Sequence, residues 1–250
     1  MRSIGCSLAL ASVGGGEDDA ARRLRAGLAL ARAGGCGAVQ LDGSSGGMRA
    51  RELDRSARRD VAATLKREGV AFSGVDLWVP ERHFAEAAHV DRALRAVVEA
   101  CGLAGELAKL TDAESRVSVC VTVAKSAAPA AVAAIGGAAM GAGVVVADYG
   151  PGERVVEDSI GAGFDPAAEL AAGRDPLARL GEMGGTVADA RLTDSTRVGR
   201  CAVGDGSLDV RAYRAVLETV TAVRWVVVDV RGVSRGAGAV GGAVGAWEGG

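Results

Sequence analysis

Aspartates recur at the ends of the β-branched runs of this chain, and among all residue types their positions are the most suggestive of a functional site. They lie at the end of such a run or directly after it: Asp42, Asp76, Asp148, Asp165, Asp189 and Asp229. If the runs are parallel strands, their carboxyl ends meet at one edge, where carboxylates repel one another unless a cation lies among them. A ligand set made only of oxygen atoms suits Mg2+ or Mn2+. The pattern therefore predicts a divalent-metal site.

The same aspartates also have a purely structural interpretation. Aspartate at the end of a strand commonly forms a turn or caps the next helix, and for Asp42 and Asp194 we favour this interpretation. Asp165 precedes Pro166 and a helical segment, as an N-cap residue does. For Asp148, Asp165 and Asp229 both interpretations stay open.

The histidine inventory excludes a zinc hydrolase site with three histidine ligands. The chain has two histidines, His83 and His89, which both follow the third β-branched run. His83 lies in a loop from which its side chain can reach the strand ends, so we expect it to contact a substrate. His89 begins a helix and is expected to be solvated or capping. A nucleophile elbow, a P-loop and a dinucleotide-binding glycine motif are all absent from the sequence.

The elements that must position these residues alternate regularly. The predicted strands cover residues 3–8, 38–42, 70–78, 117–123, 144–148, 160–164, 186–191 and 224–230. Helical periodicity is clearest after Asp18, a predicted N-cap, where Leu24, Leu28 and Ala31 share one stripe that ends at Gly34. Further helical stripes contain Val61 and Leu65 before Gly69, Val90 to Cys101, and Leu208 to Val220.

Eight strand-helix repeats predict an α/β fold, a closed (β/α)8 TIM barrel of parallel strands, for which about 250 residues is typical. An open doubly wound sheet is the alternative. The barrel is expected over residues 1–233. Residues 234–250 are rich in glycine and nearly uncharged, so we expect a poorly ordered tail or a weak replacement for the closing helix.

Composition excludes several classes of partner. The net charge of −2 and an aromatic content of 3% argue against nucleic acid and against a membrane surface. The uncharged stretch Ser126 to Ala147 contains Pro129 and is expected to be a buried helix that runs into a strand. Five scattered cysteines without a CxxC motif favour a reducing compartment, and we predict a cytoplasmic location.

Several segments, in order, resemble one known family. They are SIGCSLA, GCGAVQLDG, RELDRSARRDVAATLKREGVAFSGVDLWVPERHF, IGAGFDPAAELAAGRDPLARL, VADARLTDS and GDGSLDVRAYRAVLETV followed by WVVVDVRG. In these segments the chain resembles the xylose isomerase-like TIM barrel superfamily, specifically proteins labelled sugar phosphate isomerase/epimerase. The resemblance implies a sugar or sugar-phosphate substrate, a divalent metal such as Mn2+ or Mg2+, and proton transfer through an enediolate. Related members commonly pair through their barrels, so the resemblance is also compatible with a homodimer.

The resemblance assigns the site residue by residue. Active members hold the metal with a Glu ending strand five, an Asp ending strand six, a His in strand seven and a Glu in strand eight, and the two glutamates move the proton. Here Asp165 matches the strand-six aspartate, Asp148 falls where the first glutamate belongs, and Asp229 takes the place of the second. Asp189 and Arg191 stand around the position of the histidine. The histidine that often follows the strand-six aspartate by three residues is Ala168.

Two hypotheses of different classes follow. In the first, the chain is a metal-dependent isomerase or epimerase with Asp148 and Asp229 as catalytic residues. Its metal ligands would be Asp165, Asp148, Asp189 and Asp229, and its substrate contacts would be His83, Arg191 and Asp42. In the second, the barrel has lost its metal and its catalysis, and it serves as a binding or scaffold protein. Arg191 would then pair with the carboxylates in place of the metal. A DNA repair enzyme of the endonuclease IV type would need more histidines.

Overall fold

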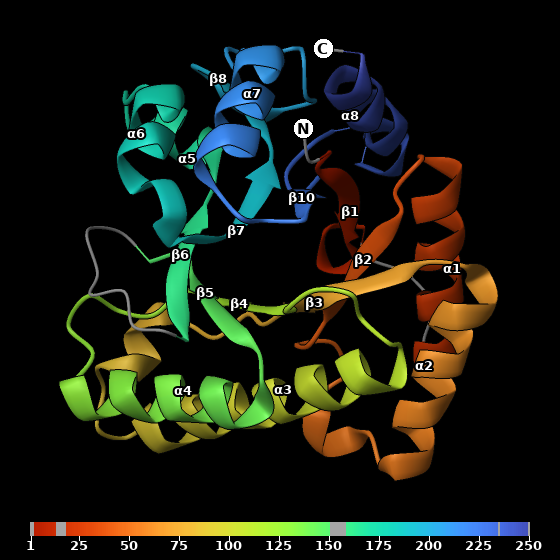
Figure 1. The fold of residues 1–250 in the computed structure, drawn as a ribbon. Coiled ribbons are helices and arrows are strands. Elements are labelled where there is room, and N and C mark those ends of the chain that lie inside the picture. Colours follow the sequence, from red (N-terminus) through yellow and green to blue (C-terminus); the bar gives the residue numbers. More distant parts are fainter. Residues whose placement is uncertain (1–2, 14–18, 151–158, 235, 250) are drawn as a thin grey trace.

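The centre of the molecule is a closed barrel of parallel strands (Figure 1). The computed structural model describes residues 3–13, 19–150, 159–234 and 236–249. Around the barrel the strand order is β1-β10-β7-β6-β5-β4-β3-β2. The strands are β1 Gly5–Ala9, β2 Ala38–Asp42, β3 Ala71–Asp76, β4 Ser118–Val121, β5 Val145–Asp148, β6 Ile160–Phe164, β7 Val187–Leu192 and β10 Trp225–Val228. Because β1 pairs with β10, the predicted TIM barrel is confirmed and the open sheet is wrong.

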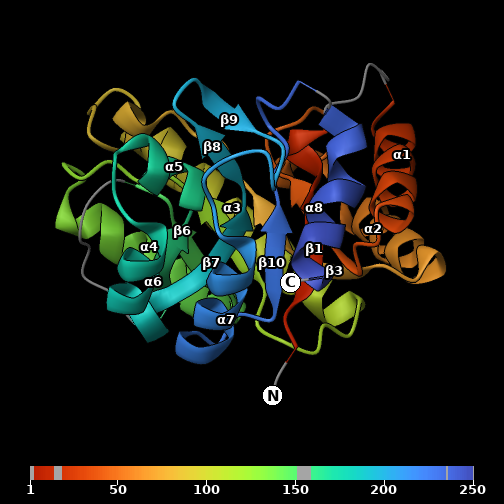
Figure 2. The ribbon, with the colours of Figure 1, turned by 90° about the horizontal axis from the view of Figure 1, so that it is seen from above.

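Helices surround the barrel (Figures 1 and 2). They are α1 Ala20–Ala33, α2 Arg55–Glu68, α3 Val90–Leu110, α4 Pro129–Ala142, α5 Pro166–Ala171, α6 Pro176–Met183, α7 Val210–Val220 and α8 Ala239–Glu248. Short 3-10 turns are η1 Leu10–Ser12, η2 Ala50–Glu52, η3 Glu81–Phe84, η4 Gly184–Thr186 and η5 Gly236–Gly238. After β7 the chain forms an antiparallel hairpin of β8 Asp194–Thr196 and β9 Gly199–Cys201, at the barrel end toward which β10 points (Figure 2).

Aspartate caps explain where several helices begin. The side chains of Asp19, Asp54, Asp165, Asp175 and Asp209 each accept a hydrogen bond from a backbone N–H in the first turn of the following helix. The predicted cap at Asp18 lies outside the described residues, and the neighbouring Asp19 caps α1.

The predicted apolar stripes face the barrel. Leu24, Leu28 and Ala31 of α1 are buried, as are Val61 and Leu65 of α2. The stretch Ser126 to Ala147 contains α4 and most of β5, as expected. No helix in the described part of the chain is long and apolar enough to cross a membrane.

The glycine-rich tail contains α8, which matches the second of the two expectations for it, a weak replacement for the closing helix. This helix lies between α7 and α1 in both views of the ribbon (Figures 1 and 2). Trp247 is 1% exposed, and its indole N–H donates a hydrogen bond of 3.0 Å to the carbonyl of Ile4. At Gly34 a Cβ atom would lie 2.6 Å from Val240, so glycine there lets α8 approach α1 closely. Burial of an indole and small side chains stabilises a helix whose own propensity is poor.

Candidate functional site

A cavity of about 550 Å3 opens at the carboxyl ends of the strands. Its charged lining residues are Asp76, Glu81, Asp165, Arg191, Arg200, Asp229 and Arg231. A second cavity of about 540 Å3 is lined by strand starts such as Val145, Ile160 and Val187. In TIM barrels chemistry is found at the carboxyl ends of the strands, so the first cavity, the barrel mouth, is the candidate site.

Arg191, on β7, is the central cation of the barrel mouth. Its Nη1 donates a hydrogen bond to Oδ2 of Asp229, and its Nη2 lies 3.4 Å from Oδ1 of Asp76. The guanidinium carbon lies 4.5 Å from the ring centroid of Tyr149, within the range of a cation–π contact. These side chains are almost fully buried, so the ion pair is shielded from solvent. The ion pair between Arg191 and Asp229 joins β7 to the segment that follows β10.

Arg231 is a second arginine that contacts the carboxylates of both Asp76 and Asp229. Its Nε lies 2.9 Å from Oδ1 of Asp229, and its Nη2 lies 2.7 Å from Oδ2 of that residue. The same Nη2 is 2.9 Å from Oδ2 of Asp76. Asp76 and Asp229 are therefore held together by two guanidinium groups. Arg231 was not among the predicted site residues, although its place two residues after Asp229 was a readable signal.

Asp165 caps α5, in agreement with its structural interpretation, and also takes part in an ion pair. Its Oδ1 accepts hydrogen bonds from the backbone N–H of Ala167 at 3.1 Å and from the hydroxyl of Thr193 at 2.6 Å. Its Oδ2 accepts a hydrogen bond from Arg200, which also lies 3.5 Å from Asp229. The carboxylate is thus a helix cap and a member of the charged network. Arg200 comes from the β8–β9 hairpin, which sequence reasoning did not predict.

Asp148 and Asp189 lie apart from the lining of the barrel mouth. Oδ1 of Asp148 accepts hydrogen bonds from the backbone N–H groups of Val123 at 2.9 Å and Gly150 at 2.8 Å. It therefore tethers the segment after β4 to the end of β5, which is a structural use of a carboxylate.

The carboxylate of Asp189 lies deeper, inside the barrel. It accepts hydrogen bonds from Gln40 at 2.7 Å, from Ser118 at 2.7 Å and from the hydroxyl of Tyr149. A Cβ atom at Gly163 would lie 2.4 Å from the ring of Tyr149, so this glycine makes room for the tyrosine. Tyr149 thus separates Asp189 from Arg191, which its ring contacts.

Asp42, Asp194 and His83 do not line the barrel mouth. Asp42 accepts a hydrogen bond from the backbone N–H of Ser44 at 2.9 Å. Asp194 accepts backbone hydrogen bonds from Ser195, Gly204, Gly206 and Leu208. Both contacts agree with the turn interpretation of these aspartates. His83 lies on η3, in the segment between β3 and α3.

Burial sets the electrostatics of the mouth. Desolvation raises the pKa of Asp76 and of Asp229, and the charge of Arg191 opposes this rise in both. Desolvation also raises the pKa of Asp189, against the lowering effect of the hydrogen bonds from Tyr149 and Ser118. Arg191 therefore favours the ionised form of Asp76 and of Asp229 against the effect of burial.

The residues of the mouth do not fit a divalent metal. Asp165 and Asp229, two of the expected ligands, are already bound by Arg200, Arg191 and Arg231. A metal ion bound to these oxygens would displace guanidinium groups and lie close to their positive charges. The other two expected ligands, Asp148 and Asp189, do not line the mouth. Asp148 accepts a hydrogen bond from the backbone of Val123, and Asp189 accepts one from the side chain of Gln40. The carboxylates of Asp165 and Asp229 are thus paired with arginine side chains in the structure.

Solved structures share this fold. A xylose isomerase domain protein from Planctomyces limnophilus has a TM-score of 0.71 at 13% identity, with 99% of this chain and 96% of that chain covered. A sugar phosphate isomerase/epimerase from Parabacteroides distasonis has a TM-score of 0.66 at 12% identity, with 98% and 94% covered. The D-allulose 3-epimerase from Methylomonas sp., in complex with D-allulose, has a TM-score of 0.63 at 11% identity, with 92% and 85% covered.

Searches by sequence give no comparable finding, because neither a family model nor a curated protein matches the chain. The likeness is therefore one of three-dimensional arrangement, and it spans nearly all of the chain. The closed barrel and these likenesses together show that the chain has the (β/α)8 barrel fold that these isomerase and epimerase structures have.

Proposed function

We propose that the barrel mouth binds a sugar or a sugar-derived ligand without a metal ion. The observation that supports this proposal most strongly is the network in which Arg191, Arg200 and Arg231 neutralise Asp76, Asp165 and Asp229. Such a network presents fixed donors and acceptors side by side, which suits neighbouring hydroxyl groups. Because the two signs of charge offset each other, a neutral sugar is favoured over a strongly anionic one.

Trp78 supplies an apolar surface beside this polar network. Trp78 lies in the segment after β3, lines the mouth, and is 70% exposed. A large aromatic ring exposed in a polar cavity can pack against the C–H face of a sugar ring and gain apolar contact area. The Methylomonas epimerase of the same fold was solved with a bound sugar, which is consistent with a sugar ligand here.

A metal-free isomerase or epimerase is the second candidate function. Asp76 and Asp229 line the same cavity, and burial raises the pKa of each. A carboxyl group with a raised pKa is better suited to accept and return a proton near neutral pH. Arg191 and Arg231 would stabilise the developing enediolate by hydrogen bonding, as preorganised donors do at an oxyanion.

Thermal unfolding of the EDTA-treated protein tests the binding proposal. We expect a neutral aldose or ketose at millimolar concentration to raise the melting temperature, and we expect Mn2+ or Mg2+ alone to leave it unchanged. Binding at 100 times Kd adds about 2.7 kcal/mol, which a melting curve resolves. Trp78→Ala should abolish the sugar effect while the protein still melts cooperatively.

The control for this experiment is Val198→Ala, because Val198 is also an exposed apolar residue, 99% exposed against 70% for Trp78, but lies outside the mouth lining. Stabilisation by Mn2+ that disappears in Asp165→Asn would contradict the metal-free proposal and support the metal-dependent one. Stabilisation only by sugar phosphates would replace the neutral ligand with an anionic one.

Isotope exchange separates the two candidate functions. A sugar that binds is incubated with the protein in D2O, and deuterium at the carbon next to its carbonyl is followed by NMR. Exchange that is lost in Asp229→Asn would establish proton transfer at the mouth. Binding without exchange would leave a binding protein.

A further inference from the structure

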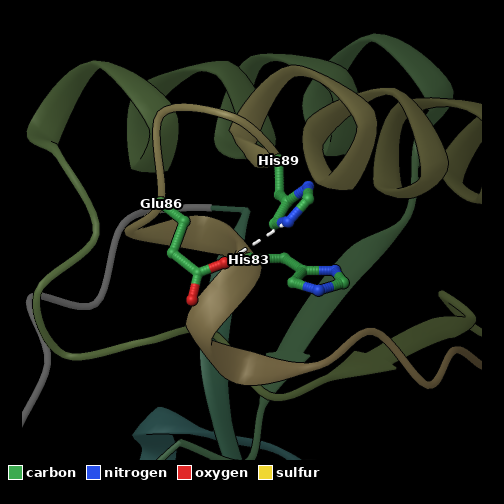
Figure 3. A group of neighbouring side chains, drawn as sticks. All are labelled: His83, Glu86 and His89. Atoms are coloured by element: carbon green, nitrogen blue, oxygen red, sulfur yellow. Dashed lines mark ion pairs between the residues drawn. The ribbon is translucent and has the colours of Figure 1, made fainter.

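Both histidines of the chain lie together with Glu86, outside the barrel mouth. Figure 3 shows the three side chains on one side of the loop that enters α3. The ring centroids of His83 and His89 are 4.5 Å apart, and Nε2 of His89 lies 3.6 Å from Oε2 of Glu86. One nitrogen or oxygen atom from each residue lies within 4.8 Å of the others. None of these three residues lines the barrel mouth.

The backbone fixes this arrangement. His83 belongs to η3, Glu86 lies in the following turn, and His89 is the N-cap residue of α3. The carbonyl of Glu86 accepts hydrogen bonds from the N–H of His89 at 2.9 Å and of Val90 at 3.0 Å. Phe84, which is 1% exposed, anchors η3 in the core. The spacing of three residues between successive members therefore places all three side chains on the same side of a tight turn.

Two imidazoles and one carboxylate form the ligand set of many zinc sites that keep a fourth position for water. In a tetrahedral zinc site neighbouring ligand atoms lie about 3.3 Å apart, given bond lengths of about 2.0 Å. The pair His89–Glu86 is already close to this separation. The side chains of His89 and Glu86 are 38% and 43% exposed, so small rotations can bring the set together.

We propose that His83, Glu86 and His89 form a zinc-binding site on the loop between β3 and α3. Two arginines, Arg82 and Arg92, bring positive charge near the three residues. Arg82 Nε lies 3.7 Å from Oε1 of Glu86, whereas Oε2 is the oxygen on the His89 side. Arg82 is 74% exposed, and such a surface pair is easily exchanged for a metal ligand.

Zinc at this site would join η3 to the start of α3. The same loop carries Trp78 and Glu81, which line the barrel mouth. Zinc would therefore stabilise the wall of the mouth from outside, without entering it. The ligand set does not depend on the proposed sugar binding, so the two proposals are tested separately.

Titration of the EDTA-treated full-length protein with Zn2+ by calorimetry, and with Co2+ by visible absorption, tests the site. We expect one ion per chain and the intense d–d bands of four-coordinate Co2+. His83→Ala, His89→Ala and Glu86→Gln should each weaken binding by about tenfold or more, since even loss of an outer-shell partner costs about 10- to 100-fold.

Matched variants exclude other sites. Asp91→Asn removes a neighbouring acid, and Cys201→Ser removes the cysteine that is not buried. Asp165→Asn removes an acid of the mouth. All of these should bind Zn2+ within about twofold of the wild type, well inside the tenfold effect expected for a ligand. Binding that survives in the double variant His83→Ala/His89→Ala, or no saturable binding in a protein that melts cooperatively, would overturn the proposal.

Discussion

Arg191 and Asp229 form an ion pair inside the barrel mouth, where the side chain of Asp229 is 0% exposed and that of Arg191 is 9% exposed. The two residues come from β7 and from the end of β10, which are adjacent in the barrel. Their pairing places a fixed positive charge among the carboxylates. This charge offsets the repulsion that otherwise calls for a metal ion.

Removing one partner of this pair should be costly. We expect Asp229→Ala to lower the free energy of unfolding by about 3–5 kcal/mol, because Arg191 is left buried without its main carboxylate. Urea denaturation measures the change. Asp60→Ala, at an exposed position of α2, is the control and should change stability by less than about 0.5 kcal/mol. A loss of less than 1 kcal/mol in Asp229→Ala would show that the pair is solvated.

The free energy of unfolding of the Asp189→Asn variant, relative to that of the wild type, should increase as the pH rises. Burial raises the pKa of Asp189 in the folded protein, whereas the unfolded chain has a value near 3.9. The stability contribution of this group is present below the unfolded value and is lost as the pH rises through the folded value, with a slope of at most about 1.4 kcal/mol per pH unit.

The measurement is the free energy of unfolding of wild type and Asp189→Asn at several pH values from 4 upward. The advantage of the variant should grow across this range, while the lost charge-assisted hydrogen bonds lower its stability by a constant amount. Parallel pH profiles for the two proteins would show that burial does not control this carboxylate.

Trp247→Ala should destabilise the protein by about 3–5 kcal/mol, as expected for truncation of a buried aromatic side chain. Its indole packs edge-on against Tyr213 at a centroid distance of 6.0 Å. Trp247→Phe keeps most of the packing but loses the hydrogen bond to Ile4, so it should cost less than Trp247→Ala. Thermal unfolding of the two variants makes the comparison. A wild-type melting temperature in Trp247→Ala would mean that α8 does not close the barrel.

The cysteines should differ sharply in reactivity. Burial raises the pKa of Cys6, Cys36 and Cys101 to about 12, so these thiols carry almost no thiolate near neutral pH. Cys201 is partly exposed. With an aromatic disulfide reagent we expect Cys201 to react first in the native protein, and the other thiols to react only after unfolding. Cys201→Ser should remove the fast phase, and rapid labelling of Cys101 would contradict the buried core.

Local patterns were enough to predict the eight strands of the barrel and the C-terminal ends of α1 and α2. The predicted strand at residues 38–42 has the bounds of β2, and Gly34 and Gly69 stand at the C-caps of α1 and α2. These features depend on β-branched runs, apolar spacing and capping residues, which act over a few neighbouring positions. The order of the elements then restricted the fold to a parallel barrel or an open parallel sheet.

The candidate site could be predicted only in part for the same reason. Sequence order places Asp165, Arg191 and Asp229 at strand ends, but it does not show which oxygen meets which guanidinium. Arg200 reaches Asp165 from a hairpin 35 residues away, and Trp247 closes on Ile4 across 243 residues. Such contacts depend on closure of the barrel and on burial, which are properties of the whole fold. Local sequence patterns thus account for the barrel strands and for the acids at their ends. Which arginines pair with those acids follows only from the folded barrel, because burial brings distant side chains into the same mouth.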